Sequence, residues 1–250
     1  MTKKKTPAPQ ASRLPQQLSE YWPQFQAAAP EAIHEVRKLT RRAGAEAEVS
    51  DMKKGVRRQW RSIRRAAAPI RDHDAAGEHL LDALHELGAS KTALQRFERG
   101  WAARRAELVR LHPLPAGMPA AHCLPPDWRK RADKLLEADR RELLRRGKRL
   151  MRAEDDESGS AAWHDWRKLM KRYRYTLELS GPSPATVRDM LEQLGRLQDA
   201  EVLLDLLPQE AQLFSQTHLA ALQAREEQAR RDARAEARRL WPALRAHLKG

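Results

Sequence analysis

The chain has 250 residues, and its 48 Lys and Arg residues against 34 Asp and Glu residues give a formal net charge of +14. No run of 18 apolar residues occurs, so we expect no membrane-spanning helix, and no apolar segment after the basic start suggests a secretory signal. A single cysteine, Cys123, excludes a disulfide scaffold and a multi-cysteine zinc site, and it fits the reducing cytoplasm. The charge excess indicates a polyanionic partner.

The predicted elements begin with a basic, proline-rich tail over residues 1–14, which we expect to be disordered. From about Leu14 onward, Ala, Leu, Arg, Glu and Gln dominate and no stretch alternates with period two, which predicts helices nearly throughout. Residues 112–126 form the one long predicted loop. The last predicted helix runs over about 209–247. Prolines, glycines or capping residues predict further breaks at 30, 50–51, 69, 88–90, 157–160, 181–184 and 208. The sequence therefore predicts an all-α fold of about ten helices.

The chain also contains an internal repeat. Residues 34–42 and 164–172 match at six positions with a constant offset of 130: His, Arg, Lys, Leu, a cation and Arg. An Asp follows later in each half, at Asp72 and Asp199. We therefore predict a single domain over 15–250 built from two repeats, about 15–111 and 127–248, joined by the loop 112–126.

The repeated segments place cations on one side of a helix. At 100° per residue, the five basic residues of each copy occupy an arc of about 140°, with apolar residues opposite. The first basic arc comprises His34, Arg37, Lys38, Arg41 and Arg42, and the second comprises His164, Arg167, Lys168, Lys171 and Arg172. A single such helix is ordinarily a solvated amphipathic helix, but solvated faces usually mix both signs because like charges repel. Its occurrence in both halves indicates that an anion compensates the charge.

A neighbouring segment strengthens this interpretation. Residues 53–71 contain several cations and no acid. We predict that a second wall of the anion site comprises Arg57, Arg58, Arg61, Arg64 and Arg65. We expect Asp72 and Asp199 to cap helices or orient the cations rather than bind ligand.

The repeated His-x-x-Arg-Lys helix and the later Arg-Asp-x-Asp at residues 71–74 resemble the signature of the CHAD family, the conserved histidine α-helical domain. The run 163–179 is especially similar to the second repeat of that family, and the likeness extends over about residues 15–248. The resemblance implies two pseudo-symmetric four-helix bundles with a basic groove or channel between them that binds inorganic polyphosphate. Some members of the family associate with polyphosphate granules, and some carry this module after a triphosphatase domain. The Glu46-Ala47-Glu48 segment lacks the Lys that such a domain needs, so we expect a stand-alone, non-enzymatic cytoplasmic protein. Two positions depart from the pattern, because Gln198 replaces an Arg and Gly44 stands where the second half has Arg174.

The chemistry of polyphosphate suits these residue types. It carries a charge on every unit and has no bases, so arginines would donate forked hydrogen bonds and lysines would act as point charges. His34 and His164 would bind as imidazolium, or serve as neutral structural donors between helices. Arg174 and Tyr175 lie on the basic side of the second repeat and complete the predicted site.

Two other functions remain open. Basic helices also suit a nucleic-acid binder, but aromatic residues make up 5% of the chain and no zinc-finger, basic-zipper or RNA-recognition signature occurs. A metal-assisted hydrolase of polyphosphate or phosphate esters would use His34 or His164, yet no tight acidic metal motif accompanies them. His112 with His122 and Cys123 is only a weak metal candidate. We therefore expect no metal and no cofactor.

Overall fold

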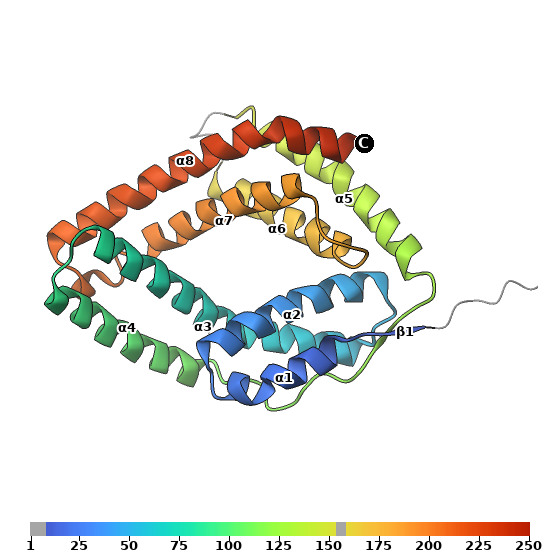
Figure 1. Ribbon diagram of the computed structural model, residues 1–250, viewed down its shortest axis with the longest axis horizontal. Helices are drawn as coiled ribbons and strands as arrows, with labels where there is room; N and C mark the ends of the chain where they lie inside the picture. Colours follow the sequence, from blue (N-terminus) through green and yellow to red (C-terminus); the bar gives the residue numbers. More distant parts are fainter. Residues whose placement is uncertain (1–8, 154–158) are drawn as a thin grey trace, which may run out of the picture. The chain divides into compact units, whose positions relative to one another are not determined.

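The computed structural model describes residues 9–153 and 159–250. Within these residues the chain is helical, with one pair of two-residue strands, so the predicted all-α class is confirmed (Figure 1). The elements in chain order are β1 (Gln10–Ala11), α1 (Leu14–Gln26), α2 (Pro30–Val49), α3 (Lys54–Glu86), α4 (Lys91–Leu111), β2 (Cys123–Leu124), α5 (Trp128–Leu150), α6 (Ser160–Leu177), α7 (Ala185–Leu206), a 3-10 turn (Ala211–Leu213) and α8 (Gln216–Lys249).

Part of the segment predicted as an N-terminal tail forms regular structure. Residues 1–8 of the predicted tail, and residues 157–158 of a predicted break, lie outside the described residues. Gln10 and Ala11 pair antiparallel with Leu124 and Cys123, and Leu14 is buried at the start of α1. The prediction for residues 10–14 was wrong because backbone pairing with a distant loop gives no local sequence signal.

Two helix boundaries also differ from the prediction. Pro69 does not end a helix but lies inside α3. A proline in a helix removes one backbone hydrogen bond, and here the fully buried Ala67 and Ile70 hold the turns on both sides of it in the core. The last helix begins at Gln216 rather than 209, because the Ser215 side chain accepts a hydrogen bond from the backbone N–H of His218 at 3.2 Å and caps it.

The chain divides into two compact units, each described by itself. Unit 1 comprises the described residues up to Asp74, then Arg105–Leu136 and Tyr175–Ser180. Its core joins α1, α2 and the first part of α3 through side chains such as Phe25, Ile33 and Ile63. Trp128 and Leu124 form a smaller cluster with Val49. This core fixes α2 and α3 of unit 1 side by side.

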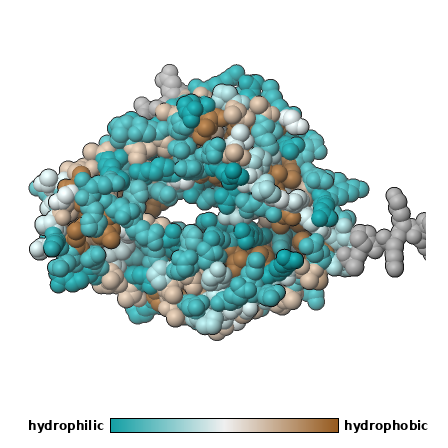
Figure 2. Space-filling view, viewed as in Figure 1, coloured by the Kyte–Doolittle hydropathy of each residue, from teal (hydrophilic) through white to brown (hydrophobic). Residues whose placement is uncertain are grey.

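Unit 2 comprises Ala75–Arg104, the described residues of Glu137–Arg174, and Gly181–Gly250. Trp163 and Trp166 on α6 are buried, and Trp166 meets Trp241 of α8 edge to face. At Gly147 a Cβ atom would lie 2.6 Å from the ring of Trp241, so this close approach of α5 and α8 requires glycine. The visible faces of both units are mainly hydrophilic (Figure 2). In the described parts of the chain, no helix has the length and apolar character needed to cross a bilayer.

Candidate anion-binding site

The first basic arc lies on α2 in unit 1. Pro30 occupies the first turn of α2, where its missing N–H costs nothing, and Ile33 and Val36 bury the opposite side of the helix. Arg42 is exposed and Arg41 is half-buried. The structure thus places these cations on the side of α2 away from its core, as the periodicity predicts.

Arg37 is the most enclosed cation of the first basic arc. Its Nη1 donates to the carbonyl oxygen of Ala68 at 2.8 Å and to Oδ1 of Asp72 at 3.0 Å, both on α3. The Arg37 side chain is 13% exposed, whereas Asp72 is 63% exposed. Burial lowers the pKa of Arg37, and the facing Asp72 carboxylate opposes this shift. Arg37 therefore joins α2 to α3, and Asp72 lies where an orienting acid is expected.

Neighbouring charges also act on Lys38 and His34, which share the first basic arc with Arg37. Lys38 Nζ lies 2.5 Å from Oε1 of Glu35 one turn earlier, so this acid offsets part of the charge of the arc. Burial lowers the pKa of His34, and the charges of Arg71 and Lys38 lower it further. His34 belongs to the helix motif of the first repeat, and Arg71 belongs to the later Arg-Asp-x-Asp motif of the same repeat. The two side chains lie close enough for their positive charges to repel.

The predicted second wall on α3 contains arginines with different roles. Arg57 donates from Nε to the carbonyl of Met52 at 3.1 Å and from Nη2 to the carbonyls of Ala47 and Ser50. It thereby satisfies carbonyls at the C-terminal end of α2 and in the turn that follows. Arg58, Arg61 and Arg65 are exposed, and they form no hydrogen bond or ion pair with the described residues.

The cations of α2 and α3 converge in unit 1. Burial lowers the pKa of Arg64, and the charges of Arg61, Arg41 and Arg65 lower it further. A small groove of about 120 Å³ between the two helices is lined by Gly44, Arg61 and Arg64 among others. A Cβ at Gly44 would meet nothing within 4 Å, so the missing cation leaves open space beside the α3 arginines.

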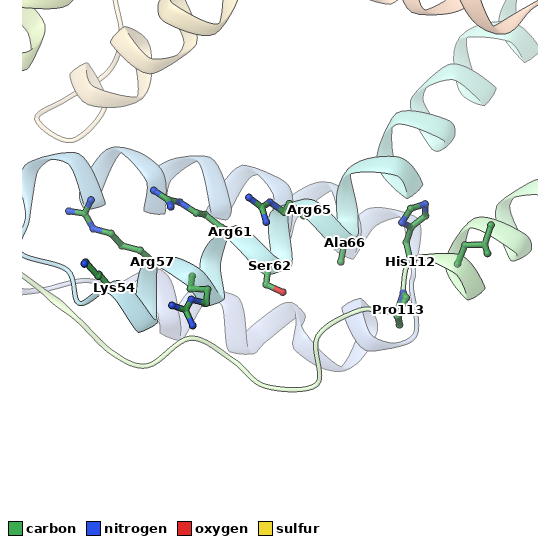
Figure 3. Close-up of a pocket in the computed structure, with 10 residues that line it drawn as sticks. Lys54, Arg57, Arg61, Ser62, Arg65, Ala66, His112 and Pro113 are labelled. Carbon is green, nitrogen blue, oxygen red and sulfur yellow. The ribbon is translucent and has the colours of Figure 1, made fainter.

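A larger groove follows the exposed side of α3 (Figure 3). We call it the α3 groove. It has a volume of about 870 Å³ and is lined by Lys54, Arg57, Arg58, Arg61, Ser62, Arg65, Ala66, Leu111, His112 and Pro113. Lys54, Ser62 and His112 were not in the predicted site. Lys54 continues the spacing of Arg58, so a helical projection would have found it. His112 comes from the loop after α4, whose path the sequence does not specify.

The second basic arc lies on α6 in unit 2. His164 Nδ1 is hydrogen-bonded to Oε1 of Gln198 on α7, and Lys168 Nζ lies 3.1 Å from Oδ1 of Asp165. Gln198 thus occupies, beside His164, a place corresponding to that of Arg71 beside His34. With Gln198 in place of an arginine, unit 2 has one cation fewer, but the histidine motif on α6 still contacts the later motif on α7.

The remaining residues of the second basic arc are partly enclosed. Arg167, Lys171 and Arg174 are half-buried, and each interacts with other residues. Tyr175 is 6% exposed and belongs to the core, although the helical projection placed it on the basic side. Asp199 is exposed on α7. The structure therefore brings the α6 cations together but encloses Tyr175.

Two buried acids were not identified from the sequence. Arg172 forms hydrogen bonds from Nε, at 3.1 Å, and from Nη2 to the carboxylate of Asp139, whose side chain is 1% exposed. Glu226 on α8 is fully buried and contacts His79 at 2.9 Å and Arg196 at 2.8 Å. Both acids interrupt an apolar stripe of their own helix, a pattern that predicts a buried cationic partner.

One member of the weak metal candidate in the loop 112–126, His122, contacts a carboxylate of α2. Nε2 of His122 lies 2.7 Å from Oε2 of the buried Glu46 on α2. No group of three or more His, Cys, Asp or Glu side chains within residues 9–153 and 159–250 is arranged to hold a metal ion. His122 thus ties the loop to α2.

Comparisons with known proteins identify the fold and the family of this chain. No curated protein matches the chain. The solved structure of PptA from Streptomyces chartreusis superposes with a TM-score of 0.63 and 20% identity, over 92% of this chain and 96% of that one. That likeness shows a shared fold. The sequence model of the CHAD domain matches residues 10–200, which is most of the chain. The chain belongs to the CHAD domain family.

Proposed function

We propose that this protein binds inorganic polyphosphate through the basic arcs of α2 and α6 and does not hydrolyse it. The observation that carries the proposal is the cation cluster of unit 1, where the charges of Arg61 on α3 and Arg41 on α2 add to burial in lowering the pKa of Arg64. Like charges held together in this way repel, and a polyanion relieves the repulsion. Membership of the CHAD family supports the same ligand.

Polyphosphate fits the residues better than nucleic acid does. Exposed guanidinium groups such as Arg42, Arg58 and Arg61 offer forked donors to phosphate oxygens. The aromatic side chains of α6, Trp163, Trp166, Tyr173 and Tyr175, are buried and offer no stacking surface for bases. A ligand made only of phosphate needs these charged donors and no stacking surface.

The proposed function is binding of polyphosphate rather than its hydrolysis. The candidate acid–base residues lie beside groups that do not orient them as bases: the charge of Arg71 acts on His34, and His164 is hydrogen-bonded to the Gln198 amide. Incubation of long-chain polyphosphate with the protein and Mg²⁺ or Mn²⁺ should release no phosphate above the rate without protein. Release that depends on His34 or His164 would establish a hydrolase instead. The shared groove between two bundles and association with polyphosphate granules stay predictions.

Retention on immobilised long-chain polyphosphate tests the site. The arc variant Arg41→Glu/Arg42→Glu and the second-arc variant Lys168→Glu/Lys171→Glu should each elute at clearly lower salt than the wild type. The matched control Arg96→Glu/Arg99→Glu changes the net charge equally on exposed positions of α4, outside both arcs. Equal elution of arc and control variants would show that net charge alone, and not the arcs, retains the protein. Circular dichroism confirms that each variant keeps its helices.

A further inference from the structure

The α3 groove differs from the basic arcs in that residues from the end of α4 and the loop after it line one end of it. In Figure 3, Arg57, Arg61 and Arg65 follow one another along α3, and His112 and Pro113 stand beyond the last of them. We propose that this groove is a separate binding site for an oligophosphate group, a short run of condensed phosphates. The group would come from the end of an inorganic polyphosphate chain or from a nucleoside triphosphate. The inference rests on the proposed function, since it assigns short condensed phosphates to part of the same basic surface.

The cations of the groove are arranged for a short linear anion. Lys54, Arg58, Arg61 and Arg65 follow at intervals of four, three and four residues, so they lie on one side of the helix. At 1.5 Å per residue, this row extends for about 16 Å. None of the described residues that line the groove carries a carboxylate. A row of like charges at these intervals is unfavourable by itself, and an anion along the row would remove the repulsion.

The guanidinium groups in the groove are available to a ligand. Arg58, Arg61 and Arg65 are exposed and make no hydrogen bond or ion pair within residues 9–153 and 159–250. In the first basic arc, by contrast, Arg37 donates to Asp72 and Lys38 contacts Glu35. The groove therefore contains uncompensated donors, whereas part of the α2 arc is already neutralised by the fold.

One arginine of the groove is not part of the proposed ligand set. Arg57 lines the groove, but its guanidinium donates to the carbonyls of Ala47, Ser50 and Met52. Its role is to hold the turn between α2 and α3, at the end of the row opposite to His112. This division gives the test an internal contrast between two adjacent arginines, Arg57 and Arg58.

The end of the groove near Arg65 is lined by residues outside α3. Leu111, His112 and Pro113 come from the end of α4 and the loop after it, and Leu111 is 52% exposed. The imidazole of His112 and the hydroxyl of Ser62 add hydrogen-bond donors to the lining of the groove. The volume of about 870 Å³ is within the range of small-ligand pockets, about 300–1,000 Å³. These features favour a chain end or a short chain.

Calorimetric titration of the full chain with inorganic tripolyphosphate tests the site, with ATP as the second ligand. The groove variant Arg58→Gln/Arg65→Gln should bind tripolyphosphate at least about tenfold more weakly, because it lacks two charged donors. His112→Gln should weaken tripolyphosphate binding more than it weakens retention on long-chain polyphosphate. The charge-matched control Arg96→Gln/Arg99→Gln should bind tripolyphosphate as the wild type does. If ATP binds as tightly as tripolyphosphate, the site is assigned to nucleoside triphosphates. If ATP binds much more weakly, the site is assigned to the ends of inorganic chains.

Two results would overturn the inference. One is a groove variant that binds tripolyphosphate as tightly as the wild type. The other is a wild-type protein that is retained by long-chain polyphosphate but does not bind tripolyphosphate or ATP; this result leaves the proposed function intact. A wild type that binds neither short nor long chains would instead remove the proposed function itself.

Discussion

Arg37 and Asp72 form an ion pair with Nη1 and Oδ1 3.0 Å apart, and this pair joins α2 to α3 in unit 1. Arg37 also donates to the Ala68 carbonyl at 2.8 Å, three residues after Arg65 and directly before Pro69. The first arginine of the repeated motif thus stabilises the fold at the point where α3 contains a proline. The basic surface around it depends on that junction.

We expect the two partners of this pair to contribute unequally to stability. Arg37→Gln should lower the free energy of unfolding by about 1–3 kcal/mol, because it removes the donor to a partly buried carbonyl. Asp72→Asn should cost less than about 1 kcal/mol, since Asp72 is well exposed and water can solvate Arg37 in its place. Urea unfolding measures both. Equal losses would show that the ion pair, rather than the carbonyl contact, stabilises the junction.

Arg57 and Arg58 give a second contrast on adjacent positions. Arg57→Gln should destabilise the protein by about 1–3 kcal/mol, because the carbonyls of Ala47, Ser50 and Met52 lose a charged donor. Arg58→Gln should change stability by less than about 0.5 kcal/mol, since its side chain is exposed. Thermal or urea unfolding distinguishes the two. A stable Arg57→Gln variant would contradict the structural role given to Arg57.

Glu226 predicts a specific loss of stability in acid. Burial raises the pKa of Glu226, but hydrogen bonds from His79 and Arg196 outweigh this effect and lower the pKa from 4.5 to about 2. A lowered carboxylate pKa stabilises the fold above the unfolded-state value, and the contribution disappears as pH falls from 4.5 toward 2. It amounts to roughly 3 kcal/mol at neutral pH.

The variant Glu226→Gln isolates this contribution. Its free energy of unfolding, followed by urea unfolding between about pH 5 and about pH 2.5, should fall less steeply than that of the wild type. Glu142→Gln, at an ion pair on the surface of α5, should keep the wild-type slope apart from a small change. The interpretation is wrong if the slopes of Glu226→Gln and wild type coincide.

His34 predicts proton uptake on binding. Burial, Arg71 and Lys38 lower its pKa below 6.5, so the free protein holds it largely neutral near pH 7. A bound polyanion raises this pKa, so polyphosphate affinity should rise as pH falls through the range between the free and bound values. Calorimetry in buffers of different ionisation enthalpy counts the protons. His34→Gln should reduce the uptake, and an unchanged proton count would exclude His34 from the site.

Local periodicity predicted the helices and the polarity of their faces. The cation spacing on α2 and the apolar opposite side with Val36 follow from the helical repeat alone, as does the burial of Trp163 and Trp166 on α6. The repeat also linked each histidine motif to a later acidic segment. The structure shows Arg37 in contact with Asp72 in the first half, whereas in the second half His164 contacts Gln198, the residue before the exposed Asp199.

The remaining features depend on tertiary contacts. Pro69 is a local helix breaker, and only the packing of Ala67 and Ile70 keeps α3 continuous through it. Arg57 has the same local sequence character as Arg58, and the two differ because Arg57 reaches the carbonyls that end α2. His112 enters the α3 groove through the path of a loop. None of these contacts leaves a periodic pattern in the sequence.

The most direct test of the central claim is a competition at matched salt. Long-chain polyphosphate, single-stranded DNA and duplex DNA, matched in phosphate concentration, compete for the protein against labelled polyphosphate. Binding should weaken steeply as salt increases, by analogy with counterion release from nucleic acids. We predict that polyphosphate displaces the label at much lower concentration than either DNA. Displacement by DNA as effective as that by polyphosphate would contradict a polyphosphate-binding function and indicate a general polyanion binder.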